Sequence, residues 1–205
     1  MAGQGSRSWA GVDLSERQRI RRAELLQAGI ELLGAPEGPA VSVRAVCRRC
    51  GLTERYFYES FADREEFVAQ VYGYVTDEAR NALIGAVLRA PTPEARAQAA
   101  VESFVQLIID RPTMGRVLLI APLTEPSLGG RGLQSAPAFA MLIGDQLDPL
   151  TDVADRQLLS VGLVGALASL FIAYLDGTID VGRDRFIAHC VDLLTNAYSW
   201  QRGQK

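Results

Sequence analysis

The sequence predicts an all-helical protein in which a small N-terminal domain precedes a larger helical bundle. Apolar residues recur at helical spacing in successive segments, and prolines and glycines separate these segments where helices begin and end. No segment alternates like a strand, and the sequence contains no internal repeat. The 205 residues are 48% apolar and 22% charged, which is enough apolar material for a core and typical of a globular protein.

The first helix is predicted to begin at Ser15, a suitable N-cap residue, and to end before Gly34. Residues 1–14 are then expected to form a flexible N-terminal arm. The inward face of this helix is expected to consist of five apolar residues at helical spacing: Ile20, Ala23, Leu26, Ile30 and Leu33.

A helix-turn-helix is predicted directly after the first helix. Residues 35–41 contain prolines and a glycine that interrupt any helix, and Ser42 can cap a short helix that ends at Gly51. Thr53 can cap the helix that follows. Two short helices joined by a tight turn that contains glycine form this motif, whose second helix enters the major groove of DNA.

The stretch CGLTERYFYESF, residues 50–61, places aromatic rings directly beside charges. Phe57 and Phe61 are four residues apart on a helix, so both can face inward together with Val46 and Leu52. The remaining side chains are expected to face a partner outside the fold, and they are Glu54, Arg55, Tyr56, Tyr58 and Glu59.

The rest of the chain is predicted to be a series of helices. Asp63 can cap a long fourth helix that runs until Pro91, and Pro93 and Pro112 can open the fifth and sixth helices. Residues 122–137 include three glycines and three prolines, which predicts a mobile connection. Three further helices are predicted over residues 138–150, 155–177 and 182–201.

The net charge of −3 gives no general attraction to nucleic acid, but the charges are unevenly distributed. Residues 15–64 carry nine arginines and seven acids, a balance of +2, so the rest of the chain carries −5. A function in binding nucleic acid therefore depends on a local basic surface in the N-terminal part.

The N-terminal quarter of the chain resembles the DNA-binding domain of the tetracycline-repressor (TetR) family of transcriptional regulators. The resemblance is carried by the segments LLQAGIELL, VSVRAV and CGLTERYFYESFADREEFV. Its specific features are the glycine turn at Gly51, the aromatic run Phe57-Tyr58 with Phe61, and Arg64-Glu65 at the start of the fourth helix. The resemblance implies that residues 15–62 bind DNA and that residues 63–205 bind a ligand and dimerise.

Position by position, the resemblance implies DNA contacts from Ser42, Arg44, Thr53 and Arg64, with Glu54, Arg55, Tyr56 and Tyr58 on the reading helix. Arginine can bind guanine through two hydrogen bonds, and hydroxyl groups can donate to phosphate oxygens. Glu59 and Ser60 depart from the pattern of the family, and Glu54 places a second acid on the reading face. The carboxylates of Glu54 and Glu59 can accept hydrogen bonds from cytosine, or they can simply pair with Arg55 or Arg48 on the surface.

Residues of the C-terminal part cannot be matched by motif, because that part of the family diverges in sequence. Six side chains could line a ligand pocket or form ordinary core: Phe104, Met114, Phe139, Met141, Phe171 and Tyr174. Relatives dimerise through their last two helices as a four-helix bundle, which implies that Gly162, Ala166, Ser169 and His189 lie in a dimer interface.

Two other signals have competing interpretations. Residues 158–175 contain no charge and are long enough to span a membrane, but no basic cluster flanks them and small residues form a stripe suited to helix packing. Cys47 and Cys50 leave a redox role open, although a zinc site would need a second pair of ligands. No membrane span and no metal are expected.

The polar N-terminus does not resemble a signal peptide, so a cytoplasmic location is expected.

The sequence contains no phosphate-binding loop, nucleophile elbow or metalloprotease motif, so neither an enzyme nor a cofactor is expected. The expected function is that of a homodimeric repressor that a small apolar or amphipathic effector releases from a palindromic, double-stranded operator. The alternative is a small-molecule carrier or sequestering protein of the same fold that has lost DNA recognition.

Overall fold

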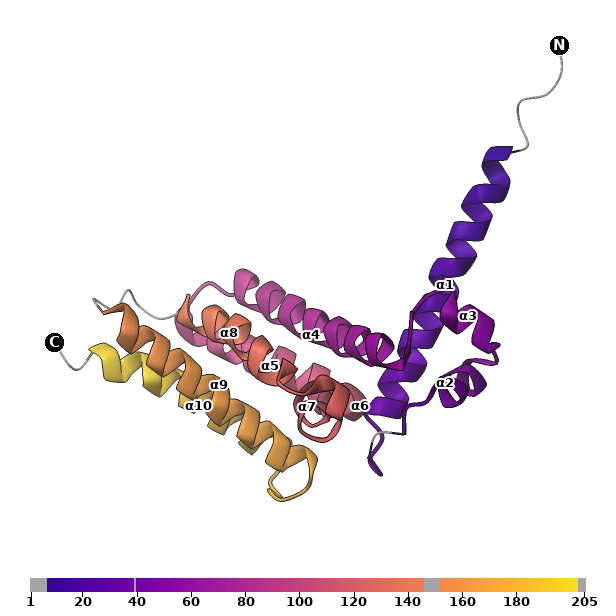
Figure 1. Cartoon of the computed structure of the whole chain (residues 1–205). Helices are drawn as coiled ribbons and strands as arrows, with labels where there is room; N and C mark the ends of the chain where they lie inside the picture. Colours follow the sequence, from indigo (N-terminus) through magenta and orange to yellow (C-terminus); the bar gives the residue numbers. More distant parts are fainter. Residues whose placement is uncertain (1–6, 39, 146–151, 203–205) are drawn as a thin grey trace, which may run out of the picture.

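The computed structural model describes residues 7–38, 40–145 and 152–202, and within these ranges it contains helices and no strand. This confirms the all-helical prediction. The helices form two parts, which Figure 1 shows side by side: an N-terminal head (residues 7–62) and a C-terminal bundle (residues 63–202). The long helix that opens the bundle also packs against the head.

The head consists of α1 (Arg7–Leu33), α2 (Val43–Cys50) and α3 (Glu54–Tyr58). The Ser42 hydroxyl accepts a hydrogen bond of 3.2 Å from the N–H of Ala45 and so caps α2, as predicted. Gly51 ends α2 in the left-handed region with a φ of 67°, where a residue with a side chain would be strained. The predicted helix-turn-helix is therefore confirmed.

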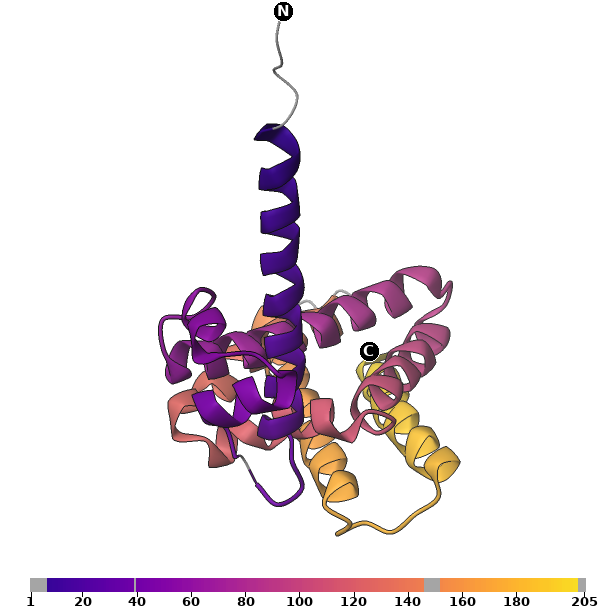
Figure 2. The ribbon, with the colours of Figure 1, turned by 90° about the vertical axis from the view of Figure 1, so that its right-hand side faces the viewer.

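The first helix is longer than predicted. It begins at Arg7 and not at Ser15, so residues 7–14 continue α1 and are not part of the predicted flexible arm, while residues 1–6 lie outside the described residues. No proline interrupts this stretch, and the isolated Gly11 costs a helix only about 1 kcal/mol. Figures 1 and 2 show the first turns of α1 projecting beyond the rest of the head.

The projection of α1 also changes its inward face. Ile20 and Ala23 were predicted to point inward, but both are exposed, because in this part of α1 the side chains that contact α3 and α4 are those of Arg21 and Arg22. The face that is buried lies further along the helix and consists of Leu25, Ala28, Ile30 and Leu33, with Leu26 half-buried beside it.

Aromatic rings fill the centre of the head. Phe57 is fully buried, and its ring centroid lies 5.4 Å from that of Phe61 and 5.1 Å from that of Phe67. Val46 is also fully buried, and Leu52 is half-buried against the same core. The predicted inward positions of these four side chains are therefore confirmed, and the third ring, that of Phe67, comes from α4 and ties the head to the bundle.

The bundle begins with α4 (Arg64–Arg89), α5 (Pro93–Ile108) and α6 (Pro112–Leu119), with both prolines at the predicted helix starts. The Asp63 carboxylate caps α4 by accepting the Glu66 N–H at 2.8 Å, and the Glu66 carboxylate accepts the Ala62 N–H at 2.6 Å in return. The chain continues through α7 (Ala121–Thr124), the 3₁₀ turn η1 (Pro126–Leu128), α8 (Arg131–Gly144), α9 (Val153–Leu175) and α10 (Arg183–Arg202).

The prediction of a mobile connection over residues 122–137 is wrong. This segment contains most of α7, all of η1 and the first half of α8, and Pro137 lies inside α8. Leu128 is fully buried and Glu125 is 5% exposed, so both side chains anchor the segment to the bundle. Composition alone indicated a loop because the two anchors are separated by residues that favour turns.

Candidate nucleic-acid interface and candidate ligand site

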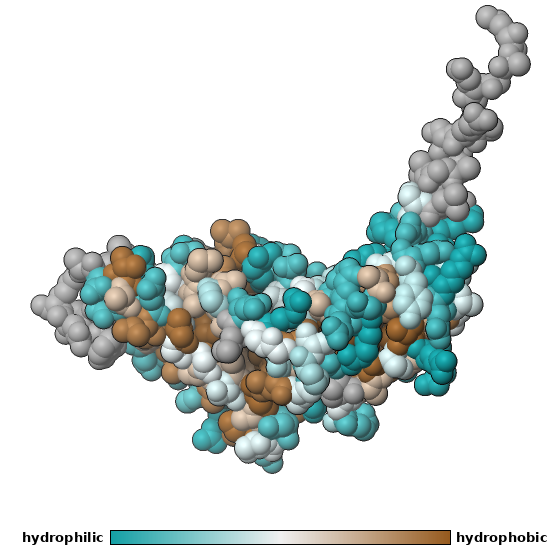
Figure 3. All heavy atoms as spheres, viewed as in Figure 1, coloured by the Kyte–Doolittle hydropathy of each residue, from teal (hydrophilic) through white to brown (hydrophobic). Residues whose placement is uncertain are grey.

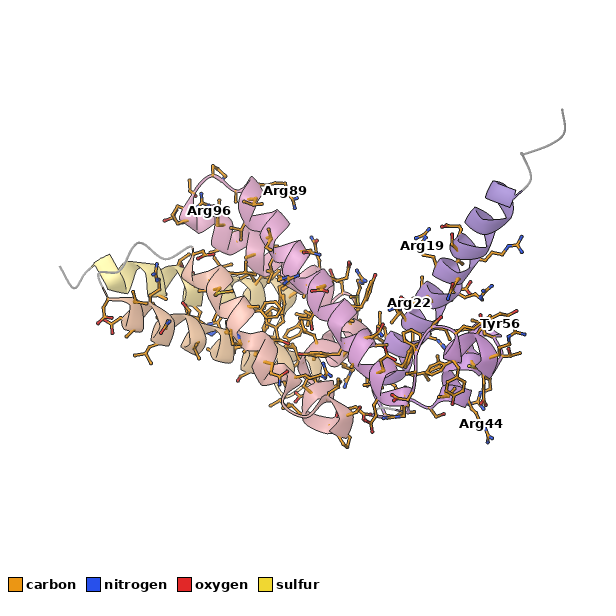
Figure 4. The ribbon with its side chains drawn as sticks, turned by 45° about the horizontal axis from the view of Figure 1, so that its top comes forward. Arg19, Arg22, Arg44, Tyr56, Arg89 and Arg96 are labelled. Atoms are coloured by element: carbon orange, nitrogen blue, oxygen red, sulfur yellow. The ribbon has the colours of Figure 1, made fainter. Side chains whose placement is uncertain are left out.

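The outer surface of the head carries several of the side chains predicted to contact DNA. Arg44 and Arg55 have side chains that are 89% and 83% exposed, and Tyr58 is 55% exposed. Thr53 is also exposed, and because its side chain makes no capping hydrogen bond, the prediction that it caps α3 is wrong. Figure 4 shows Arg44 and Tyr56 at the end of the molecule opposite the α4–α5 turn, where Arg89 and Arg96 lie.

Each of these arginines faces a glutamate. The Arg44 Nε lies 3.4 Å from the Glu54 carboxylate, and the Arg55 Nε donates to the Glu59 carboxylate at 3.1 Å. The pairing of Glu59 with Arg55 is one that the sequence suggested, whereas the partner of Glu54 is Arg44 and not Arg48. Exposed pairs of this kind contribute little stability, so phosphate oxygens can replace the carboxylates as partners of the guanidinium groups.

Tyr56 points toward α1 and is only half-exposed, which differs from its predicted outward position. The Arg21 guanidinium lies over its ring at 4.4 Å from the centroid, and an Arg21 nitrogen lies 3.9 Å from the Glu59 carboxylate. The side-chain amide of Gln18 donates to the Glu59 carbonyl at 3.4 Å. Sequence reasoning missed Arg21, although the density of arginines in this part of α1 was a usable signal.

Arg64 does not lie on the outer surface of the head. Its Nε donates to the Val41 carbonyl at 2.8 Å, and its two terminal nitrogens donate to the buried Glu125 carboxylate at 3.1 and 2.6 Å. The guanidinium lowers the pKa of Glu125, and hydrogen bonds from Ser127 act in the same direction, against the effect of burial. In this structure the Arg64 side chain therefore joins the head to the bundle, and its contact with DNA stays a prediction.

The predicted ligand residues form a packed cluster with one exception. The Phe171 ring lies 4.8 Å from Phe104 and 5.1 Å from Phe186, and the Tyr174 ring lies 4.4 Å from Phe186, all measured between centroids. Met114 is 2% exposed, and Phe139 packs on Phe104 at 6.5 Å. Met141 is 65% exposed, so its predicted inward position is wrong. The other five side chains form core in this structure.

A cleft of about 200 Å³ lies between α4 and α8. The Tyr72 hydroxyl donates to the Ser135 hydroxyl at 3.2 Å across it. Polar and small residues line this cleft, among them Tyr72, Thr76, Asp77, Arg131, Gln134 and Ser135. Sequence reasoning looked for rings and thioethers and therefore missed these residues.

The outer side of α9 is apolar and uncovered. Leu158 and Val161 are 73% and 61% exposed, and Figure 3 shows hydrophobic residues at the surface along this helix. Among the described residues, α9 has the length and composition of a helix that could span a membrane. Only 17% of its most apolar 18-residue stretch is buried, so most of this apolar surface has no partner within the part of the chain that the structure describes. The residues predicted for a dimer interface are exposed here, and they are Gly162, Ala166, Ser169 and His189.

The two cysteines of α2 are free and form no disulfide. Cys47 is buried, and Cys50 is half-buried with its Sγ 3.4 Å from the Glu24 carbonyl, to which it donates. Burial raises the pKa of both thiols, which lowers the fraction of reactive thiolate. In the described parts of the chain, no group of three or more histidine, cysteine or acidic side chains is placed to hold a metal ion.

Comparisons with known proteins find likeness in structure and not in sequence. No protein-family model matches the chain, and no curated protein matches it with significance. A TetR-like transcriptional regulator from Rhodococcus sp. RHA1 matches with a TM-score of 0.70 at 17% identity, over 87% of this chain and 96% of that one. A TetR-family transcription regulator from Marinobacter aquaeolei VT8 matches with a TM-score of 0.65 at 17% identity, over 89% and 97%.

The multidrug-binding protein EbrR, in complex with imidazole, matches with a TM-score of 0.63 at 18% identity, over 86% of this chain and 94% of that one. These likenesses cover the head and the bundle together, because each spans most of both chains. At such low sequence identities, these structural matches establish only that the helices are arranged in the same way. The chain therefore has the fold of the TetR-family transcriptional regulators.

Proposed function

We propose that this chain is a sequence-specific DNA-binding transcriptional regulator, and most simply a cytoplasmic repressor that a small ligand releases from its operator. The observation that carries the proposal is the exposed basic and aromatic surface on a helix-turn-helix whose first helix is capped by Ser42. Several structural neighbours are described as transcriptional regulators, which supports the same class.

DNA contact would use the exposed side chains of α2 and α3. Arg44 and Arg55 would exchange their glutamate partners for phosphate oxygens or for a guanine edge. The hydroxyls of Ser42, Thr53 and Tyr58 would donate to phosphates. Because acids stand beside both arginines, DNA must compete with them, so binding should be selective and should weaken steeply as salt concentration rises.

The uncovered face of α9 would pair with the same face of a second copy. Such an isologous contact has two-fold symmetry, so the two heads would address a palindromic site. Reading helices in dimers of this kind meet half-sites about 34 to 36 Å apart or a multiple of that spacing.

The α4–α8 cleft is the proposed entrance for the effector. Its polar lining suits the polar end of an amphipathic molecule, and the apolar end would have to displace part of the aromatic cluster around Phe171. EbrR, one of the structural neighbours, is described as a multidrug-binding protein, which supports a ligand of this class. By linkage the ligand and the operator would weaken each other equally, typically by about 1–3 kcal/mol.

The proposal is tested by selecting randomised duplex DNA with the purified full-length protein at moderate salt and sequencing what is retained. One enriched palindrome is the expected result. Arg55→Ala should then relax the preference at one base pair, at a cost of about 1–3 kcal/mol, while Tyr58→Phe should weaken binding to all sequences by removing a phosphate donor.

Arg89→Ala is the matched control, because Arg89 lies at the far end of α4 from the head and should leave affinity unchanged. Equal binding by wild type, Arg55→Ala and Tyr58→Phe would refute the assignment of these contacts. If no sequence is enriched although the protein still binds small molecules, the carrier function becomes the better account, with Glu54 and Glu59 as the groups that mask the surface.

The dimer is tested by placing a charge on the outer face of α9. Leu158→Glu or Val161→Glu should raise the dimer dissociation constant by at least about 30-fold, since a central apolar contact contributes about 2 kcal/mol or more. Sedimentation equilibrium measures this as a shift of mass toward the monomer. Leu88→Glu is the control because Leu88 is 80% exposed on α4, and an identical shift for all three variants would contradict the assignment.

A further inference from the structure

Arg64 stands where the head, the long helix α4 and the α7–η1 segment meet. It is the first residue of α4, directly after the capping residue Asp63. Its guanidinium donates to the Val41 carbonyl, in the segment that leads into α2, and to both oxygens of Glu125, between α7 and η1. A single side chain therefore ties the backbone next to the helix-turn-helix to a segment of the bundle.

Glu125 is held as firmly as Arg64. It is 5% exposed, and besides the two bonds from Arg64 its Oε1 accepts the Ser127 hydroxyl at 2.8 Å and the Ser127 N–H at 3.2 Å. A buried carboxylate needs such partners, because without them it would have to become neutral or move toward water. The carboxylate therefore has one defined position, and so has the guanidinium that binds it in two-pronged geometry.

A second contact between the head and the bundle lies where α1 ends. A Cβ on Gly34 would stand 2.1 Å from the Thr113 carbonyl oxygen in α6, so the two backbones touch there. A contact of backbone on backbone can act as a pivot, but it does not fix the angle of the head. The head also packs on α4 through apolar rings, which can slide on one another, whereas the pair of Arg64 and Glu125 adds an attachment with directional hydrogen bonds that resists rotation about the contact at Gly34.

Glu125 is also close in sequence to the α4–α8 cleft. After η1 ends at Leu128, α8 begins at Arg131, and Arg131 and Ser135 line the cleft. A change in the position of α8 would therefore be transmitted to Glu125 through only a few residues.

We infer that Arg64 and Glu125 are positioning residues that set the orientation of the head on the bundle, and thereby the spacing of the two heads over DNA. The consequence for DNA spacing rests on the proposed function, whereas the orientation of the head within one chain does not. Neither side chain touches DNA in this proposal.

The first experiment needs no DNA. Spin labels at Arg48→Cys in α2 and Arg89→Cys in α4, in a Cys50→Ser background and diluted with unlabelled chain, report the head-to-bundle distance by double electron–electron resonance. Glu125→Gln and Arg64→Lys should broaden this distance distribution, because each leaves the link incomplete. Asp110→Asn is the control, since it removes a two-pronged pair with Arg183 that joins the α5–α6 turn to α10 and includes no residue of the head. A distribution as narrow as in wild type for both link variants would overturn the inference.

The second experiment uses the operator found by selection, with base pairs inserted or removed between its half-sites. Wild type should prefer one spacing, and Glu125→Gln should reduce that preference at least about 5-fold while keeping the base preference within each half-site. A variant that is merely less stable would lose affinity for all spacings alike, and that result would also overturn the inference. If the distances broaden but no operator exists, the positioning role stands and the regulatory function fails.

Discussion

Replacing Phe57 by alanine is expected to unfold the N-terminal head while the C-terminal bundle keeps its helices. Phe57 is fully buried, and its ring contacts those of Phe61 and Phe67 at centroid distances of 5.4 and 5.1 Å. Removing a buried phenylalanine costs about 3–5 kcal/mol, because contacts are lost and a cavity remains. A domain as small as the head has a stability of only about 0.1 kcal/mol per residue, so this loss removes most of it.

Hydrogen exchange measures this effect region by region. Amides of α2 and α3 should lose their protection in Phe57→Ala, whereas those of α5 and α10 should keep it. Phe57→Leu is the matched control, because it retains most of the apolar volume and should cost less than half as much. Uniform loss of protection along the whole chain would show that the head and the bundle unfold as one unit.

Gly34→Ala is expected to destabilise the chain by about 3 kcal/mol. The new Cβ would lie 2.1 Å from the Thr113 carbonyl oxygen and 2.8 Å from its carbonyl carbon. Because both atoms belong to the backbone of α6, relief requires a shift of the helix and not the turn of a side chain. The head would also lose the pivot on which it rests against the bundle.

Urea denaturation measures this loss: the urea concentration at the midpoint of unfolding should be lower for Gly34→Ala than for wild type, while the dependence of the unfolding free energy on urea stays unchanged. Gly73→Ala serves as the control, since Gly73 lies inside α4 and a Cβ there meets no atom within 4 Å. Alanine is a better helix former than glycine, so Gly73→Ala should raise the stability by about 0.5–1 kcal/mol. Equal midpoints for Gly34→Ala and wild type would mean that α1 and α6 do not approach so closely.

Helix ends were predictable wherever the signal lies within a few residues. The caps at Ser42 and Asp63, the left-handed Gly51 and the helix openings at Pro93 and Pro112 were all expected and are all present. Phe57 and Phe61 were likewise predicted to be buried, because a four-residue spacing at helical geometry puts two side chains on one face, and the Phe61 N–H bonds the Phe57 carbonyl although α3 ends at Tyr58. The pair of Arg55 and Glu59 follows from the same spacing.

What depended on distant neighbours could not be predicted in this way. Arg64 was assigned to DNA contact because its position matches a family pattern, but its partner Glu125 stands 61 residues away. The end of α1 at Gly34 was predicted correctly for an incomplete reason. Gly34 is not among the glycines with positive φ, and the side chain is absent there because α6 passes too close.

The sequence by itself therefore determined the helical class, most helix starts and ends, and the helix-turn-helix, since these depend on interactions within a turn or two of chain. Tertiary structure alone decided that Ile20 and Met141 are exposed and that Glu125 is buried. It also decided that residues 122–137 contain helices and that Arg21 stacks on Tyr56. Each of these features depends on which helix packs against the residue in question. Helical periodicity in the sequence indicates only whether a face is apolar or polar. The partner of that face is set when the helices pack together.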